Sequence, residues 1–164
     1  MSAAAAVLAA LRERSETLAT AESLTGGLIG ELLTGVPGAS AAYVGGVISY
    51  ATRLKATLAD VDPATLAELG PVAARTAAEM AAGVAGRCGA DWGLAVTGVA
   101  GPQPQDGHPV GQVFVAVAHP ASGPPQVREL RLVGTRSEIR AQTAEAALAL
   151  LAEALGMPDP TAGV

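Results

Sequence analysis

Apolar and polar positions change their spacing along the chain, and each change predicts the start of a new element. Short apolar runs predict strands, whereas apolar residues three or four positions apart predict helices. The predicted strands are 17–21, 43–50, 92–97, 112–118 and 126–133. The predicted helices are 3–14, 25–33, 63–70, 72–88 and 137–155. Residues 98–109, rich in Gly and Pro, are expected to form a loop, and the tail 156–164 is expected to be flexible.

The order of these elements predicts the fold class. Helices and strands alternate in the first half, which favours an α/β protein with a three-layer α/β/α sandwich. The last strands are joined by a short Pro/Gly turn, so part of the sheet is expected to be antiparallel. We therefore expect a mixed, largely parallel sheet of about five strands within a single domain, 1–164.

The amino-acid composition limits which partners and which cellular compartment are expected for this protein. Half of the residues are hydrophobic but only 2% are aromatic, so the core must consist mainly of Ala, Val and Leu. The net charge of −5 argues against a nucleic-acid surface, which needs clustered Lys and Arg. The Ala-rich start is interpreted as a helix rather than a signal peptide, and no run reaches the ~18 apolar residues of a membrane span. A cytoplasmic protein with no membrane partner is expected.

Cysteine and histidine residues suggest no further chemistry. Cys88 is the single cysteine, so no intramolecular disulfide is possible, and it is interpreted as a small buried apolar residue. His108 and His119 lie near Asp106 in the sequence, but their spacing matches no metal site. Alanine- and valine-rich helices are suited to packing between subunits, so a homo-oligomer is expected.

The stretch Thr20-Ala-Glu-Ser-Leu-Thr-Gly-Gly27 carries the strongest chemical signal. A serine, Ser23, stands where an apolar strand is predicted to turn into a helix. Helix N-termini have unpaired backbone N–H groups that can hold an oxyanion or a phosphate. Thr25 follows closely, and Gly26 and Gly27 allow a ligand to approach the backbone. Two interpretations stay open: Ser23 is a nucleophile in an anion-binding turn, or Ser23 or Thr25 is simply a helix N-cap.

Lys55 is the single lysine in a chain with nine arginines. Lysine, unlike arginine, loses its proton near neutral pH when it is desolvated. Together with Tyr50 it follows the second predicted strand, and strand ends are where α/β proteins bind ligands. Lys55 is therefore a candidate base for Ser23, with Tyr50 sharing in proton transfer. The alternatives are a solvated surface lysine and a core tyrosine with an exposed hydroxyl.

Two further segments are expected near the same sheet edge. The loop Thr97-Gly-Val-Ala-Gly-Pro102, with Gly98 and Gly101, follows the third strand and is either a pocket wall or an ordinary connection. Arg136 and Arg140 lie one turn apart on the last predicted helix. One interpretation is that they bind a phosphate or a carboxylate. The other is that they belong to a solvated helix face.

Taken together, four motifs resemble those of the CinA C-terminal domain, the PncC-type nicotinamide-nucleotide amidase family. They are Ala21-Glu-Ser-Leu-Thr-Gly-Gly27, Gly46-Val-Ile-Ser-Tyr50 with Lys55, Thr97-Gly-Val-Ala-Gly-Pro102 and Pro109-Val-Gly-Gln-Val113. The resemblance spans residues 5–155. It implies an α/β/α domain that deamidates nicotinamide mononucleotide, a small-molecule substrate, to nicotinic acid mononucleotide and ammonia, with no metal or organic cofactor.

The resemblance also implies site roles. Ser23, Lys55 and Tyr50 match the catalytic residues. Thr97 matches a site threonine or serine, and Arg140 matches a late arginine associated with the site. With Thr25, Gly26, Gly27, Gly98 and Gly101, these last two are the expected substrate-binding residues.

The chain also departs from the family pattern. Residues 103–108 read Gln-Pro-Gln-Asp-Gly-His, where the family usually has a Gly-Gly pair and a lysine. This difference keeps a second hypothesis open, a non-catalytic nucleotide-binding or assembly module. A third is a partner domain in competence or DNA-damage responses. Many family members carry an additional N-terminal domain, which 164 residues are too few to include.

Overall fold

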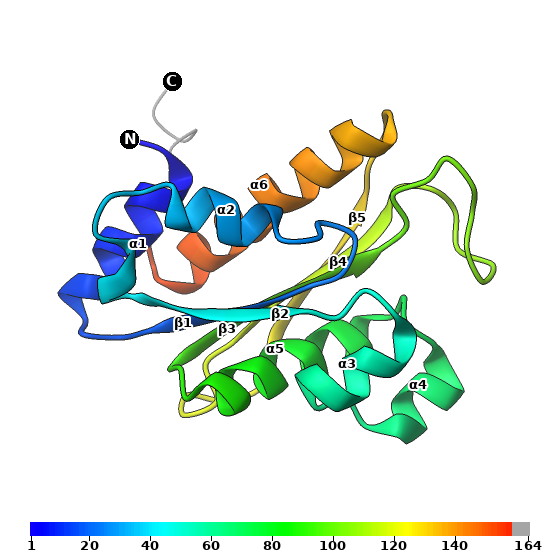
Figure 1. Ribbon diagram of the computed structural model, residues 1–164, viewed down its shortest axis with the longest axis horizontal. Helices are drawn as coiled ribbons and strands as arrows, with labels where there is room; N and C mark the ends of the chain where they lie inside the picture. The colour runs from blue at the N-terminus through cyan, green and yellow to red at the C-terminus, as the bar shows by residue number, and fades with distance from the viewer. Residues whose placement is uncertain (159–164) are drawn as a thin grey trace.

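The computed structural model describes residues 1–158, and they form three layers around one sheet (Figure 1). The tail expected to be flexible therefore lies outside the described residues from position 159 onward. One outer layer contains α1 (Ala3–Glu13), α2 (Leu28–Thr34) and α6 (Arg136–Ala154). The other contains α3 (Thr52–Ala59), α4 (Pro63–Leu69) and α5 (Ala74–Cys88). The α/β/α architecture predicted from the alternating pattern is confirmed.

The central sheet has five strands in the order β2-β1-β3-β4-β5. The strands are β1 (Leu18–Glu22), β2 (Tyr43–Ile48), β3 (Trp92–Gly98), β4 (Gln112–Ala118) and β5 (Gln126–Arg131). β1 pairs in parallel with β2 and β3, and β4 is antiparallel to both of its neighbours. Four of the strands thus run in one direction, so the sheet is mixed and largely parallel, as expected.

The topology places the carboxyl ends of β1, β2 and β3 at one edge of the sheet. The chain leaves β1 to form β2 on one side and later returns to form β3 on the other. Such a reversal leaves a crevice at the carboxyl end of the middle strand, where open α/β sheets bind ligands. The segments after all three strands carry the candidate site residues.

β2 and β5 each end two residues before their predicted bounds, and the larger differences concern α2 and α3. The second helix begins at Leu28 rather than Thr25, because Gly26 and Gly27 have φ values of 59° and 109°, which an α-helix cannot contain. Residues 23–27 form a turn instead. The helix α3 was not predicted, and residues 49–51 separate it from β2.

The two sides of the sheet have different cores. Leu and Val dominate the side covered by α1, α2 and α6. On the other side α5 packs against alanines of the strands, including Ala19, Ala21, Ala95 and Ala116. Small side chains let α5 approach the sheet and α3 closely. The prediction of a core built mainly from Ala, Val and Leu is confirmed on both faces of the sheet.

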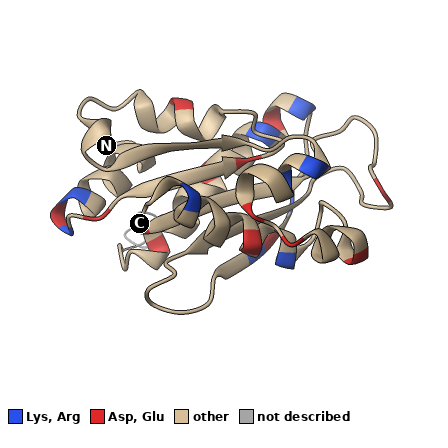
Figure 2. Ribbon diagram, turned by 60° about the horizontal axis from the view of Figure 1, so that its bottom comes forward, with Lys and Arg blue, Asp and Glu red and all other residues tan. Residues whose placement is uncertain are grey.

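Charged residues are distributed along the whole described chain rather than gathered on one element (Figure 2). Four arginines form ion pairs with carboxylates, namely Arg75 with Glu79, Arg87 with Asp60, Arg128 with Glu153 and Arg131 with Glu129. Glu79 also accepts hydrogen bonds from the Thr65 hydroxyl and the Asp62 N–H. No helix within residues 1–158 has the length and apolar character needed to cross a bilayer.

The contact between α5 and α3 depends on a glycine. A Cβ atom at Gly83 would lie 1.8 Å from the Ala59 carbonyl oxygen and 2.7 Å from its carbon. Gly83→Ala is therefore expected to lower the free energy of unfolding by at least about 2 kcal/mol, because the backbone of α3 must move to make room. Urea denaturation of the parent and the variant measures this loss.

Gly86, one turn later in α5, supplies the matched control. A Cβ atom there would meet nothing within 4 Å. Gly86→Ala should therefore raise the free energy of unfolding by up to about 1 kcal/mol, since alanine has the better helix propensity. Equal effects of the two substitutions would show that α5 does not approach α3 as closely as described.

Candidate active site

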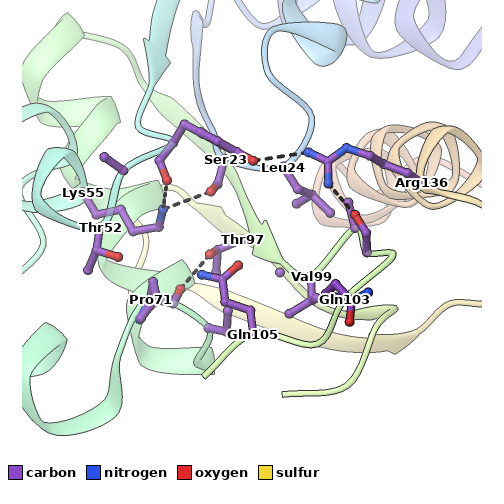
Figure 3. Close-up of a pocket in the computed structure, with 16 residues that line it drawn as sticks. Ser23, Leu24, Thr52, Lys55, Pro71, Thr97, Val99, Gln103, Gln105 and Arg136 are labelled. Carbon is purple, nitrogen blue, oxygen red and sulfur yellow. Dashed lines mark hydrogen bonds between the residues drawn. The ribbon is translucent and has the colours of Figure 1, made fainter. Parts of the chain in front are cut away.

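Ser23 lies immediately after β1, at the carboxyl end of the middle parallel strand. Its side chain is 6% exposed and faces the cavity shown in Figure 3. The segment that follows it is a turn, closed by hydrogen bonds from Gly26 N to Ser23 O and from Leu28 N to Thr25 O. Ser23 is thus held at a strand-to-turn junction rather than at the first turn of a helix.

Lys55 contacts Ser23 directly. It projects from α3, and its Nζ atom lies 2.9 Å from the Ser23 Oγ atom. Nζ also donates hydrogen bonds to the carbonyl oxygens of Ser49, at 2.7 Å, and Tyr50, at 3.4 Å. The structure therefore brings together the predicted nucleophile and base, which are 32 residues apart in the sequence.

The environment of Lys55 favours its neutral form. The residue is 1% exposed, and no carboxylate among the described residues forms an ion pair with it. Burial lowers the pKa of Lys55 from its ordinary value of 10.5 to about 8, because the charged form loses its hydration. About one tenth of the lysines are then neutral at pH 7, and most are neutral at pH 9.

A cavity of about 400 Å³ opens onto Ser23 and Lys55. Its walls come from the turn after β1, the start of α3, the loop after β3 and the beginning of α6 (Figure 3). Thr97, Gly98 and Gly101, expected from the sequence, all line it. Asp and Glu are absent from its lining residues, all of which are described, so the walls carry no fixed negative charge.

Several side chains of the cavity were not assigned from the sequence. Thr52 lies on the first turn of α3, and Gln103 and Gln105 reach the cavity from the loop after β3 (Figure 3). Their hydroxyl and carboxamide groups provide donors and acceptors for a polar substrate. The Thr97 hydroxyl instead donates to the Pro71 carbonyl oxygen at 2.6 Å, so it fixes the wall of the cavity.

Tyr50 has a different environment from the one expected for a proton carrier. The residue is 62% exposed, and its hydroxyl group accepts a hydrogen bond from Arg136 Nη2 at 3.2 Å. Arg136 also donates to the Gly101 carbonyl oxygen. The structure therefore places the Tyr50 phenol at the cavity rim, and the contact of Tyr50 with Lys55 is made by its backbone carbonyl.

Three backbone N–H groups around the start of α2 already have a carboxylate partner. Glu22 is 2% exposed, and its carboxylate accepts hydrogen bonds from Gly27, Ile29 and Gly30 at 3.2, 2.9 and 3.0 Å. These three N–H groups are therefore not free to bind an oxyanion or phosphate. A glutamate within an otherwise apolar strand was the sequence signal for this buried carboxylate.

The remaining candidates lie around the turn. Arg140 donates from Nε to Leu24 O at 2.9 Å and from Nη2 to Thr25 O at 2.8 Å. With Arg136, Ser23 and Gly26 it borders a second hollow of about 330 Å³ beside the first. Thr25 and Gly27 lie outside the lining of both hollows. No group of three or more His, Cys, Asp or Glu side chains in the described part of the chain is arranged to hold a metal ion.

The motifs and the Ser23–Lys55 pair can be compared with known proteins. The family model of the CinA C-terminal domain matches residues 1–155. The chain belongs to the CinA C-terminal domain family. The resemblance inferred from the four motifs is thereby confirmed.

Relatives and solved structures of this family agree with the assignment. The chain is 52% identical over 154 residues to a CinA-like protein of Frankia casuarinae, covering 93% of this chain and 35% of that protein. It thus spans about a third of the length of that relative. A competence/damage inducible protein of Agrobacterium tumefaciens has a TM-score of 0.88 at 35% identity over 94% of both chains. A CinA superfamily protein of Klebsiella pneumoniae has a TM-score of 0.89 at 32% identity, over 94% of this chain and 96% of that one.

Proposed function

We propose that this CinA family chain is a serine amidohydrolase that deamidates nicotinamide mononucleotide to nicotinic acid mononucleotide and ammonia. The observation that carries the proposal is the 2.9 Å contact between the Ser23 hydroxyl and a buried lysine without a carboxylate partner among the described residues. A serine paired with a deprotonable lysine is an established arrangement for acyl transfer. The family resemblance supplies the substrate.

The geometry around Lys55 suits a neutral amine that acts as a base. A neutral amine has two N–H groups and one lone pair. The carbonyl oxygens of Ser49 and Tyr50 accept the two N–H groups, which leaves the lone pair for the hydroxyl proton of Ser23. This arrangement orients the base without a third side chain, and a direct Ser23–Lys55 contact needs no relay through the Tyr50 hydroxyl.

The reaction then proceeds in two stages. Lys55 takes the Ser23 proton while Oγ attacks the carboxamide carbon, and the protonated lysine returns the proton to the departing ammonia. The resulting ester on Ser23 is hydrolysed by a water molecule, whose proton again passes to Lys55 and then back to Oγ. The net reaction consumes one water molecule and releases ammonia and the acid.

Charge in and around the cavity favours an anionic substrate. Arg136 borders both hollows and forms no ion pair with a described carboxylate. Its guanidinium keeps N–H groups beyond those used in its two hydrogen bonds. A phosphate of the mononucleotide would find donors there, at a distance from the carboxamide near Ser23.

Ammonia release from nicotinamide mononucleotide, nicotinamide and NAD tests the proposal. The mononucleotide should be the best of the three by kcat/KM, because it alone presents both a carboxamide and a terminal phosphate. Equal rates with nicotinamide would contradict phosphate recognition. Calorimetric binding of the mononucleotide without any ammonia release would instead support a non-catalytic nucleotide-binding module.

A further inference from the structure

The turn that carries Ser23 is held between two charged side chains of opposite sign. On one side, the buried Glu22 carboxylate accepts three backbone N–H groups, those of Gly27, Ile29 and Gly30. On the other, the Arg140 guanidinium donates to two backbone carbonyls, those of Leu24 and Thr25. Hydrogen bonds to charged groups are stronger than neutral ones. Both ends of residues 23–27 are therefore tied to charged partners.

We infer that Glu22 and Arg140 are positioning residues that hold Ser23 in its contact with Lys55. The inference rests on the proposed function, since it concerns how the proposed nucleophile is presented. Glu22 is the residue before Ser23. Leu24, whose carbonyl oxygen accepts a hydrogen bond from Arg140, is the residue after it. The backbone on both sides of the serine is therefore restrained, while Lys55 contacts the hydroxyl. Among the described side chains, Lys55 is the one that forms a hydrogen bond with the reacting oxygen.

This arrangement assigns Arg140 a role other than substrate binding. Its Nε and Nη2 atoms are both engaged with the turn, and a Cβ atom at Gly26 would lie 3.6 Å from Nη2. The guanidinium thus lies against the turn backbone, whereas Arg136 contacts the rim residues Tyr50 and Gly101. Lysine cannot replace Arg140 here, because a single ammonium nitrogen cannot reproduce a fork of two N–H groups fixed in one plane.

The same geometry explains why the charge of Glu22 matters. One of its oxygens accepts the N–H groups of Gly27 and Ile29, and the other accepts that of Gly30. In Glu22→Gln, an NH₂ group replaces one acceptor and faces a backbone N–H donor. The turn must shift to relieve this donor-to-donor contact, and Ser23 is adjacent to the shift.

Kinetics and chemical labelling together test the inference. In Arg140→Lys and Glu22→Gln, kcat for the mononucleotide should fall about 10- to 100-fold, with KM changed less than threefold. The rate at which phenylmethanesulfonyl fluoride modifies Ser23 should fall in parallel. This reagent has no phosphate, so a merely substrate-binding arginine would not affect its rate. Glu31→Gln, in α2, and Arg53→Lys, in α3, change exposed residues and should behave like the parent.

Each other outcome overturns a defined part of the account. A KM raised tenfold or more in Arg140→Lys, with an unchanged labelling rate, would show that Arg140 binds the substrate. If the parent releases no ammonia but its Ser23 is labelled, the proposed substrate is wrong and the labelling rates still decide the positioning role. If Ser23 in the folded parent is not labelled at all, the turn does not present a reactive serine, and the positioning role is wrong as well.

Discussion

Replacement of Ser23 by alanine is expected to lower kcat for ammonia release about 1,000-fold or more. The substitution removes the oxygen that lies 2.9 Å from Lys55 Nζ, so no acyl intermediate can form. Substrate binding should change little, because the cavity walls and Arg136 stay in place. Steady-state ammonia assays and calorimetric titration with nicotinamide mononucleotide measure the two effects separately.

Ser40→Ala is the matched control for this prediction. Ser40 is exposed in a 3-10 turn, residues Ala39–Ala41, outside the lining of both hollows beside Ser23. Its variant should keep the parent rate. A Ser23→Ala protein that retains more than a tenth of the parent kcat would mean that water attacks the carboxamide directly, without a serine nucleophile.

Replacement of Lys55 by methionine is expected to remove activity to a similar extent and to change the pH dependence of stability. Methionine fills a similar volume but cannot accept the Ser23 proton. In the parent, kcat/KM should rise with pH and level off above about 8, the pKa to which burial lowers Lys55. Lys55→Met should be inactive over the whole range.

The stability effect follows from the same lowered pKa. The unfolded chain binds the lysine proton up to about pH 10.5, whereas the folded chain releases it near pH 8. Between these values the unfolded state binds more protons, so the free energy of unfolding of the parent rises with pH. Relative to Lys55→Met, the parent should gain about 3 kcal/mol from pH 7 to pH 10.5. The cost of burying the ammonium is nearly fully present at pH 7 and falls as the pH rises through 8.

Urea denaturation of the parent and of Lys55→Met across this pH range measures the difference between their free energies of unfolding. Other titrating groups contribute equally to both proteins and cancel in this difference. Arg53→Met is the matched control, because it removes an exposed cation from the same helix. Its stability should run parallel to that of the parent at every pH. If the stability of Lys55→Met also runs parallel to that of the parent at every pH, Lys55 keeps its ordinary pKa in the folded protein.

Much of the fold was predictable because its signals are local. Apolar runs identified all five strands, and the bounds of β4 were predicted without error. The order of elements was sufficient for the layers, since short connections restrict how such elements pack. Ser23 and Lys55 could be paired because both follow strands expected to be parallel neighbours.

Other features depend on contacts that a sequence does not display. The helix α3 was missed because it has only eight residues and few large apolar ones, namely Leu54 and Leu58. The role of Glu22 follows from the exact path of the turn at Gly26 and Gly27. Whether Arg140 faces the substrate or the turn is likewise a matter of tertiary geometry, because one turn of helix separates it from Arg136.

The central claim is that a neutral Lys55 serves as the base for Ser23, and the single lysine makes a direct test possible. Protein labelled with ¹⁵N at the lysine side chain gives one Nζ resonance, which can be titrated by NMR without assignment. The account predicts a pKa of about 8 that coincides with the pH at which kcat/KM levels off. A pKa near the ordinary lysine value of about 10.4 would contradict it, because Lys55 would then stay charged at every working pH.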